Sequence, residues 1–191
     1  MATYKNFYSR QGLWTLFLMT ALPLHIWTFF LAFRDFDWIS TRTNAWDAVG
    51  VVAYGLVIAL LESAILFIGA MLLGFLVSAK WEEKRRIAFL SAVVILLSLW
   101  SIFNQSFFLS GMSVPGWLTN IVIATGRPLV ALYAMVLLLT TISFALPAFL
   151  ILISGKALGA MTEIMDRLSL LMMLYLFFDA AALVLVVIRN I

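Results

Sequence analysis

The chain has 191 residues, of which 65% are hydrophobic and 11% are charged, and its mean hydropathy is +1.12. A soluble domain is about 45–50% apolar and about 25% charged. A soluble fold of this length still exposes roughly a third of the surface of its unfolded chain, so it could not hide this much apolar surface. The composition excludes a water-soluble enzyme, a nucleic-acid binder and a disordered chain, and it predicts a protein embedded in a lipid bilayer.

Five apolar stretches are long enough to cross the bilayer, since a spanning helix needs about 20 residues. Backbone polar groups in lipid must be satisfied within the segment, so these stretches are expected to be helices. The predicted fold class is all-α: a polytopic transmembrane helical bundle that forms a single membrane domain over residues 1–191. The five expected spans are 13–33, 48–77, 87–109, 128–153 and 168–188.

The distribution of cations predicts how the chain is oriented, because Lys and Arg are kept in cytoplasmic loops. One side carries eight of them: two in residues 1–12 (Lys5, Arg10), four in 80–86, and Lys156 and Arg167. The other side carries four: Arg34, Arg42, Arg127 and Arg189. The N-terminus is therefore expected in the cytoplasm and the C-terminus outside, in a bacterial-type cytoplasmic membrane.

Two connections are expected to be loops. Asp35 and Asp37 are assigned to a solvated outer loop after the first span, and Gly155 and Gly159 to a cytoplasmic loop before the fifth. The second span has a helix-start signal, because Asn44 can cap the helix and Asp47 three residues later can reach back as in a capping box. Its 30 residues would be about 45 Å long against a hydrocarbon core of about 30 Å, so it must tilt, kink or protrude.

A shorter apolar stretch follows the third span. Pro115 suits the first turn of a helix, which predicts a short helix at about 114–124. A segment this short cannot span the bilayer. It lies either on the outer surface or in a re-entrant position that lines a permeation path, and the sequence leaves both possibilities open.

Two carboxylates near the middle of their spans are the main functional clue. Glu62 and Asp179 are predicted near the bilayer midplane, where a carboxylate costs roughly 2.5–3.5 kcal/mol. Two acids at similar depth suggest a shared polar interior that exchanges a proton or a cation. The structural alternative is a carboxyl that hydrogen-bonds across a helix interface, and Tyr175, one turn from Asp179, could supply such a bond.

His25 is a possible third member of this site. It follows Pro23, which bends a helix or frees a backbone carbonyl. A histidine at this depth could join a proton path, or it could be a neutral side chain that hydrogen-bonds to a nearby group.

One face of the second span carries small residues, which let another helix approach closely. Glu62 lies at the edge of this face, so it is expected to point along a seam between helices. The neighbouring helix could belong to the same chain or to a second subunit. The face comprises Gly55, Ala59, Ser63, Ala70 and Gly74.

The residue inventory supports no catalytic site. The chain has no cysteine and only one histidine, so it cannot build a cysteine-held zinc site, an iron–sulfur cluster or a multi-histidine metal cage. Phosphate-binding loops, dinucleotide fingerprints and hydrolase elbows are absent from the sequence. No metal site is predicted and no cofactor is indicated, and an enzyme is the class that these residues support least.

Two functional hypotheses follow. In the first, the protein handles an ion or solute through Glu62, Asp179 and His25. In the second, it is a non-catalytic accessory or scaffold subunit of a larger membrane complex, because the loops are short and the chain has no soluble domain. The expected partners are the lipid bilayer and either another copy of this chain or other membrane subunits, with no nucleic acid.

Overall fold

A computed structural model describes residues 7–78, 80–111 and 113–191, with the side chain of residue 108 left out. Lys5, which the charge comparison counts, lies outside the described residues. Within this part of the chain there are six α-helices. They are α1 (Arg10–Arg42), α2 (Ala45–Gly74), α3 (Glu83–Leu109), α4 (Gly116–Ala124), α5 (Pro128–Ile153) and α6 (Gly155–Asn190).

The expectation of five long apolar helices is confirmed. In the described ranges, α1, α2, α3, α5 and α6 are each long and apolar enough to cross a membrane. The bounds of α5 are those predicted for the fourth span, and the short helix predicted at 114–124 is α4, with Pro115 just before its first residue. The five helices support membrane insertion by their length and composition.

The assignment of Asp35 and Asp37 to a loop is wrong, because α1 continues to Arg42. The segment after Phe33 contains neither glycine nor proline, so nothing in it stops a helix. Thr41 also donates a hydrogen bond to the carbonyl of Asp37 at 2.7 Å. Hydropathy marks where the apolar stretch ends, and the helix extends beyond that point.

The assignment of Gly155 and Gly159 to a loop is also wrong, for a similar reason. Helix α6 begins at Gly155 and carries both Lys156 and Arg167 on its polar first half. Only Ser154 separates it from α5, and the Ser154 hydroxyl caps the new helix by accepting from the Ala157 N–H. The predicted connection between the fourth and fifth spans is thus one non-helical residue, Ser154, followed by the first three turns of α6.

The predicted cap of the second span is confirmed, although the helix begins at Ala45 and not at residue 48. Asn44 precedes α2, and its side-chain oxygen accepts from the Asp47 N–H at 2.8 Å. The Asn44 amide also donates to the Asp47 carboxylate at 2.8 Å, so both residues hold the first turn. The helix has 30 residues, and it ends at Gly74 instead of residue 77.

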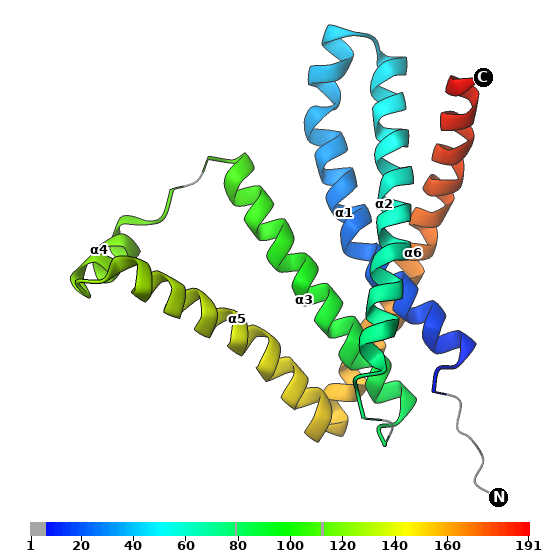
Figure 1. Cartoon of the computed structure of the whole chain (residues 1–191). Helices are drawn as coiled ribbons and strands as arrows, with labels where there is room; N and C mark the ends of the chain where they lie inside the picture. Colours follow the sequence, from blue (N-terminus) through cyan, green and yellow to red (C-terminus); the bar gives the residue numbers. More distant parts are fainter. Residues whose placement is uncertain (1–6, 79, 112) are drawn as a thin grey trace, which may run out of the picture.

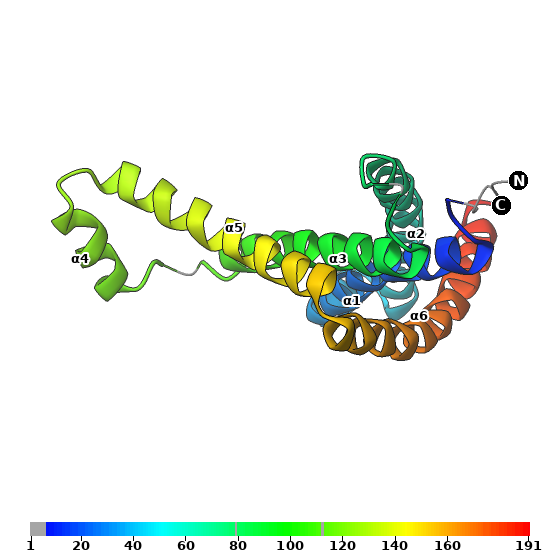
Figure 2. The ribbon, with the colours of Figure 1, turned by 90° about the horizontal axis from the view of Figure 1, so that it is seen from below.

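The helices form two groups joined at one end of the molecule. Helices α1, α2 and α6 run side by side, with the α1–α2 turn and the C-terminus at the same end (Figure 1). Helices α3 and α5 lean away from them, and α4 lies at the far end of this arm (Figure 2). Only Ile151 of α5 is buried among the residues described, and most of this apolar helix is exposed.

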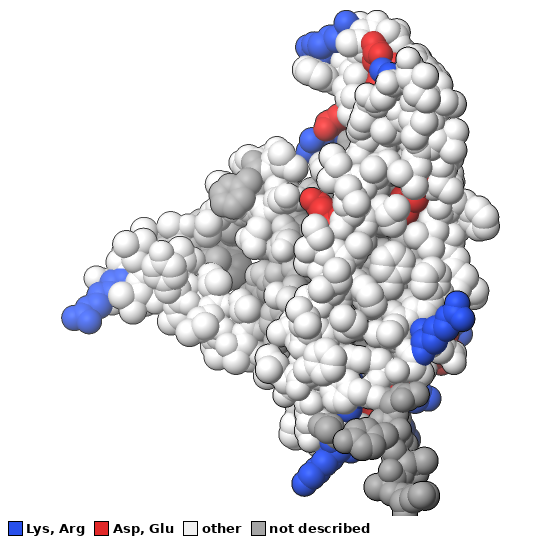
Figure 3. All heavy atoms as spheres, turned by 45° about the vertical axis from the view of Figure 1, so that its right-hand side comes forward, with Lys and Arg blue, Asp and Glu red and all other residues white. Residues whose placement is uncertain are grey.

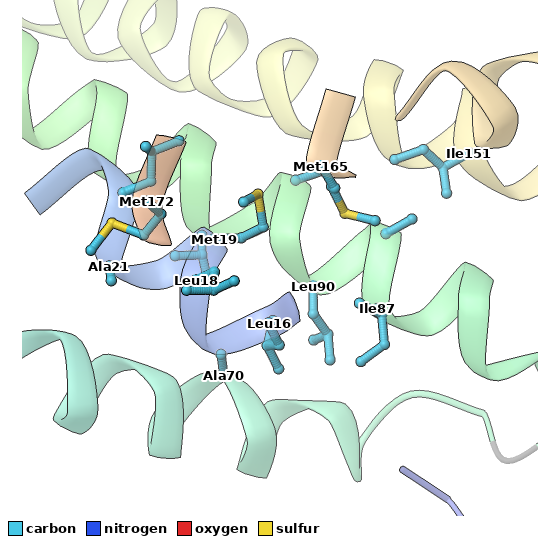
Figure 4. Packing of buried hydrophobic residues seen from close by; sticks show 14 of the residues in the cluster. Leu16, Leu18, Met19, Ala21, Ala70, Ile87, Leu90, Ile151, Met165 and Met172 are labelled. Carbon is cyan, nitrogen blue, oxygen red and sulfur yellow. The ribbon is translucent and has the colours of Figure 1, made fainter. Parts of the chain in front are cut away.

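The apolar core lies where the two groups meet. It contains side chains from α1, α2, α3, α5 and α6, which converge on Leu16 and Met19 (Figure 4). Both of these side chains are fully buried. The first half of α1 therefore lies at the centre of the core. Helices α3 and α5 each have one end at this core, and their other ends lie away from it.

The segment before α1 is fastened to the α2–α3 end. Tyr8 donates a hydrogen bond to the Met71 carbonyl at 3.0 Å, and the buried Arg86 guanidinium lies 3.6 Å from the centre of the Phe7 ring. A side chain at Gly74 would overlap the Tyr8 hydroxyl. The Glu83 carboxylate accepts from the Ser9 N–H, which places a negative charge at the N-terminus of α1.

The opposite end is held by the last residues of α6. Arg189 donates to the Trp46 carbonyl at 2.7 Å and to the Asp47 carboxylate at 2.8 Å. Gly50 leaves the space that the guanidinium occupies. The start of α2 and the end of α6 are thus joined by polar contacts.

Candidate functional site: a buried His–Asp pair and an acidic groove

The structure pairs Asp179 of α6 with His25 of α1. The imidazole Nε2 lies 2.9 Å from Oδ2 and 3.0 Å from Oδ1 of the carboxylate. The two side chains are 0% and 2% exposed, so water does not reach either group. His25 is the sixteenth of the 33 residues of α1, which puts the pair near mid-height of that helix.

The geometry allows this pair to hold one proton. Nδ1 of His25 lies 2.8 Å from the Ala21 carbonyl, which can only accept, so Nδ1 carries a hydrogen. The contact between Nε2 and the carboxylate is then satisfied in two ways: an imidazolium donates to a carboxylate, or a carboxylic acid donates to a neutral imidazole. Both arrangements contain one shared proton and have no net charge.

Either arrangement gives the imidazole and the carboxylate a hydrogen-bond partner in a dry interface, where an unpartnered polar group would be costly. The pair thereby satisfies the polar groups of both helices at the centre of the bundle.

The local sequence explains how His25 reaches α6. Helix α1 is bent (Figure 1). Pro23 accounts for a bend, because it has no N–H and the Met19 carbonyl therefore lacks its usual helical donor. The Tyr175 ring lies 6.5 Å from the imidazole and nearly parallel to it. Among the described contacts, no hydrogen bond joins Tyr175 to Asp179. Asp179 is thus hydrogen-bonded to His25 on another helix and not, as the sequence suggested, to Tyr175 on its own helix.

A groove of about 790 Å³ lies between α1, α2 and α3. Its walls are mostly apolar, and its polar side chains come from all three helices. Those are Thr28 and Asp35 of α1, Glu62 of α2, and Ser98, Ser101, Asn104 and Gln105 of α3. A cavity of roughly 300–1,000 Å³ with apolar walls and a few polar groups is typical of small-molecule sites.

Glu62 lies in this groove and is exposed. Within the described part of the chain, no hydrogen bond or ion pair involves its carboxylate. Its neighbours one turn away on α2, Ile58 and Leu66, are apolar and also line the groove. Figure 3 shows acidic side chains on a surface that is mainly uncharged between the two ends of the bundle. Glu62 is thus an open carboxylate in an apolar helix.

The structure does not bring Glu62 and Asp179 together. The groove lining includes Glu62 but neither His25 nor Asp179 among the residues described. The two acids lie on different sides of α1: one faces the groove, and the other is sealed against α6. The sequence placed both acids at similar depth, but the direction of each side chain depends on which helices are neighbours.

The small-residue face of α2 lies against this same chain. Ala59, Ser63, Ala70 and Gly74 are buried and Gly55 is half-buried. A Cβ at Gly55 would lie 3.4 Å from the methyl group of Thr28 on α1. The Ser63 hydroxyl is satisfied within α2, because it donates to the Ala59 carbonyl at 2.6 Å.

The groove was not predicted from the sequence, although α3 carries a signal for it. Ser98, Ser101 and Gln105 are spaced by three and four residues, which places them on one helical face. A polar stripe in an apolar helix indicates a face that does not contact lipid. The described residues contain no group of three or more His, Asp or Glu that could hold a metal ion.

Comparisons of the chain with protein-family models, curated proteins and solved structures find no match. The functional argument therefore depends on the geometry of the pair and of the groove.

Proposed function

We propose that this integral membrane protein handles a cation or a proton, and that Glu62 is the group that binds it. The observation that carries this proposal is an exposed carboxylate, without a partner among the described residues, in the groove between α1, α2 and α3. A carboxylate at the middle of a spanning helix is unfavourable unless a cation, a proton or water compensates it. The groove supplies access to such a partner.

His25 and Asp179 act beside this site in the proposal. Their shared proton keeps the interface between α1 and α6 neutral, and their hydrogen bonds hold the bent part of α1 in place. Pro23 and Leu24, the residues next to this bend, line the groove on the other side of α1. A change in the position of the pair would therefore change the shape of the groove.

Ion uptake by proteoliposomes tests the proposal. The full chain is reconstituted, and uptake of protons and of rubidium is followed in the native protein and in Glu62→Gln, which keeps the side-chain size and removes the charge. Glu163→Gln is the matched control, because Glu163 is exposed and its ion pair in the described structure is with Arg167, one turn away on α6. We expect Glu62→Gln to lose uptake of at least one of the ions and Glu163→Gln to retain it. Equal uptake by folded samples of all three proteins would contradict the proposal.

A second candidate function is that of an accessory subunit, and the exposure of α5 favours it. Helix α5 is strongly apolar, and Ile151 is its one buried residue in the described structure. Lipid or a neighbouring subunit must cover such a surface in the membrane. Disulfide cross-linking of Leu137→Cys in native membranes tests this candidate, since Leu137 is 69% exposed on α5 and the chain has no other cysteine. A chain that stays monomeric and captures no partner would count against it.

A further inference from the structure

The charge of the groove selects the sign of its ligand. Asp35 and Glu62 are the charged residues of its described lining, which includes no Lys, Arg or His. Arg34 compensates Asp35 through two hydrogen bonds of 2.7 and 2.9 Å. Glu62 has no such partner in the structure as described. The Glu62 carboxylate therefore favours a ligand that carries a positive charge.

The helix register gives the distances along the groove. Thr28 and Gly55 face each other across the antiparallel α1 and α2. Glu62 lies seven residues beyond Gly55, and Trp27 lies one residue beyond Thr28 in the same direction. At a rise of 1.5 Å per residue, Glu62 and Trp27 are about 9 Å apart along the bundle, and Glu62 and Asp35 are about 20 Å apart. A ligand of small-molecule length can contact both Glu62 and Trp27.

The walls around Glu62 are unsuited to holding a bare divalent metal ion. Calcium takes six to eight oxygen ligands and magnesium requires about six, whereas the residues beside Glu62 on α2 are Ile58 and Leu66. Leu97 of α3 adds a further apolar surface. An organic cation matches these walls better, because its carbon body replaces the water that would otherwise cover them.

From this we infer that the groove binds a lipophilic organic cation, whose charge lies at Glu62 and whose apolar body lies along Trp27 and Leu97. This inference rests on the proposed function, in which Glu62 binds a cation, and it adds the chemical class of the ligand. The indole of Trp27 offers a face that attracts both apolar and cationic groups. The volume of about 790 Å³ accommodates a molecule with several rings.

Binding of tetraphenylphosphonium to the full chain in nanodiscs tests the inference, with empty nanodiscs as the blank. We expect specific binding that is weaker by about tenfold or more in Glu62→Gln, because a charge pair is lost, and unchanged in Glu163→Gln. Ile58→Trp keeps the carboxylate and fills the apolar part of the groove. We expect it to lower the affinity for tetraphenylphosphonium, because the organic body of the ligand loses its place beside Glu62.

The outcomes separate the inference from the proposed function. If Glu62→Gln abolishes proton or rubidium uptake but binding of tetraphenylphosphonium is the same in all variants, the ligand class is wrong and the cation site stands. If Glu62→Gln changes neither uptake nor binding, both are wrong. If a neutral compound of the same shape binds as tightly as tetraphenylphosphonium, and Glu62→Gln changes the affinity for neither compound, the groove is an apolar site and the inference fails.

Discussion

The imidazole of His25 and the carboxylate of Asp179 show how one hydrogen-bonded pair can settle the arrangement of an apolar bundle. Lipid-like surfaces pack with little directional preference, whereas a buried polar group must find its partner. The 2.9 Å contact fixes both the rotation of α6 about its axis and the depth at which it meets α1. The sequence indicated that each residue would be buried and polar, but not that they would meet, because they are 154 positions apart.

Removing the carboxylate tests the structural part of this account. We expect Asp179→Ala to lower the free energy of unfolding in detergent by about 1–3 kcal/mol, because the buried Nε2 of His25 loses its partner. The matched control is Glu163→Ala, which breaks an exposed pair worth about 0.2–1 kcal/mol. Denaturant titration measures both. Equal losses would show that the His25–Asp179 contact contributes no more than a surface pair.

Tyr8 gives a second test at this scale. Burial raises the pKa of its hydroxyl above the usual value of 10, and the Arg86 guanidinium opposes that shift only in part. The neutral hydroxyl therefore donates to Met71 at neutral pH, and this contribution to stability is lost as the pH rises through the raised pKa. We expect Tyr8→Phe to cost about 1 kcal/mol below pH 10 and progressively less above it. A cost that does not change with pH, measured by urea unfolding across that range, would contradict this assignment.

Helix α2 contains two glycines in its second half, and we expect replacement by alanine to affect stability differently at each of them. A side chain at Gly74 would overlap the Tyr8 hydroxyl, whereas Gly69 has open space around it. We expect Gly74→Ala to destabilise the protein by about 1–3 kcal/mol, and Gly69→Ala to be neutral or to stabilise it by up to about 1 kcal/mol. Thermal unfolding compares the two. If Gly74→Ala were as well tolerated as Gly69→Ala, the segment around Tyr8 would not pack as described.

The bend of α1 belongs to the scale of the element. Pro23 is expected to bend the helix at the place where His25 turns toward α6. We expect Pro23→Ala to straighten α1 and to lengthen the distance between spin labels at Trp14 and Phe33, which are exposed positions on either side of the bend. Pulsed electron–electron spin resonance measures that distance. An unchanged distance would mean that packing, and not the proline, sets the bend.

The helices were predictable from the sequence to different degrees. The five long apolar stretches and the Asn44–Asp47 cap are local signals, and the structure confirms the five helices and the cap. The ends of α1 and α6 were missed because hydropathy falls at the edge of the apolar stretch while the helix continues through polar residues such as Asp37 and Lys156. The groove was missed because it lies between α3 and the α1–α2 pair from which α3 leans away, and no single helix carries the information about that angle.

The orientation in the membrane is a property of the whole molecule, and it stays a prediction from charge. A membrane-impermeant thiol reagent tests it in a chain that has no cysteine of its own. We expect Ser78→Cys, in the α2–α3 connection, to be labelled from the cytoplasmic side, and Thr43→Cys, at the α1–α2 turn, from the opposite side. The reverse pattern would contradict the positive-inside assignment.

The whole molecule separates two polar regions around one bent helix. On one side of α1 lies a sealed, hydrogen-bonded His–Asp pair, and on the other lies an open groove with a carboxylate that has no partner among the described residues. The proposed function needs both features: the His25–Asp179 pair holds α1 against α6, and Glu62 is a charged group that a ligand can reach. It also needs the groove to be accessible while the protein is in the membrane.

Thiol accessibility at position 62 is the most direct test of that central claim. Three single-cysteine variants are treated in native membranes with a small cationic thiol reagent: Glu62→Cys in the groove, Ser63→Cys in the adjacent buried position, and Leu139→Cys on the exposed apolar surface of α5. We predict that the cysteine at 62 reacts, and that those at 63 and 139 do not, because one is buried in protein and the other faces lipid. If the cysteine at 62 reacts no faster than the other two, the groove is closed in the membrane and Glu62 is not a cation site.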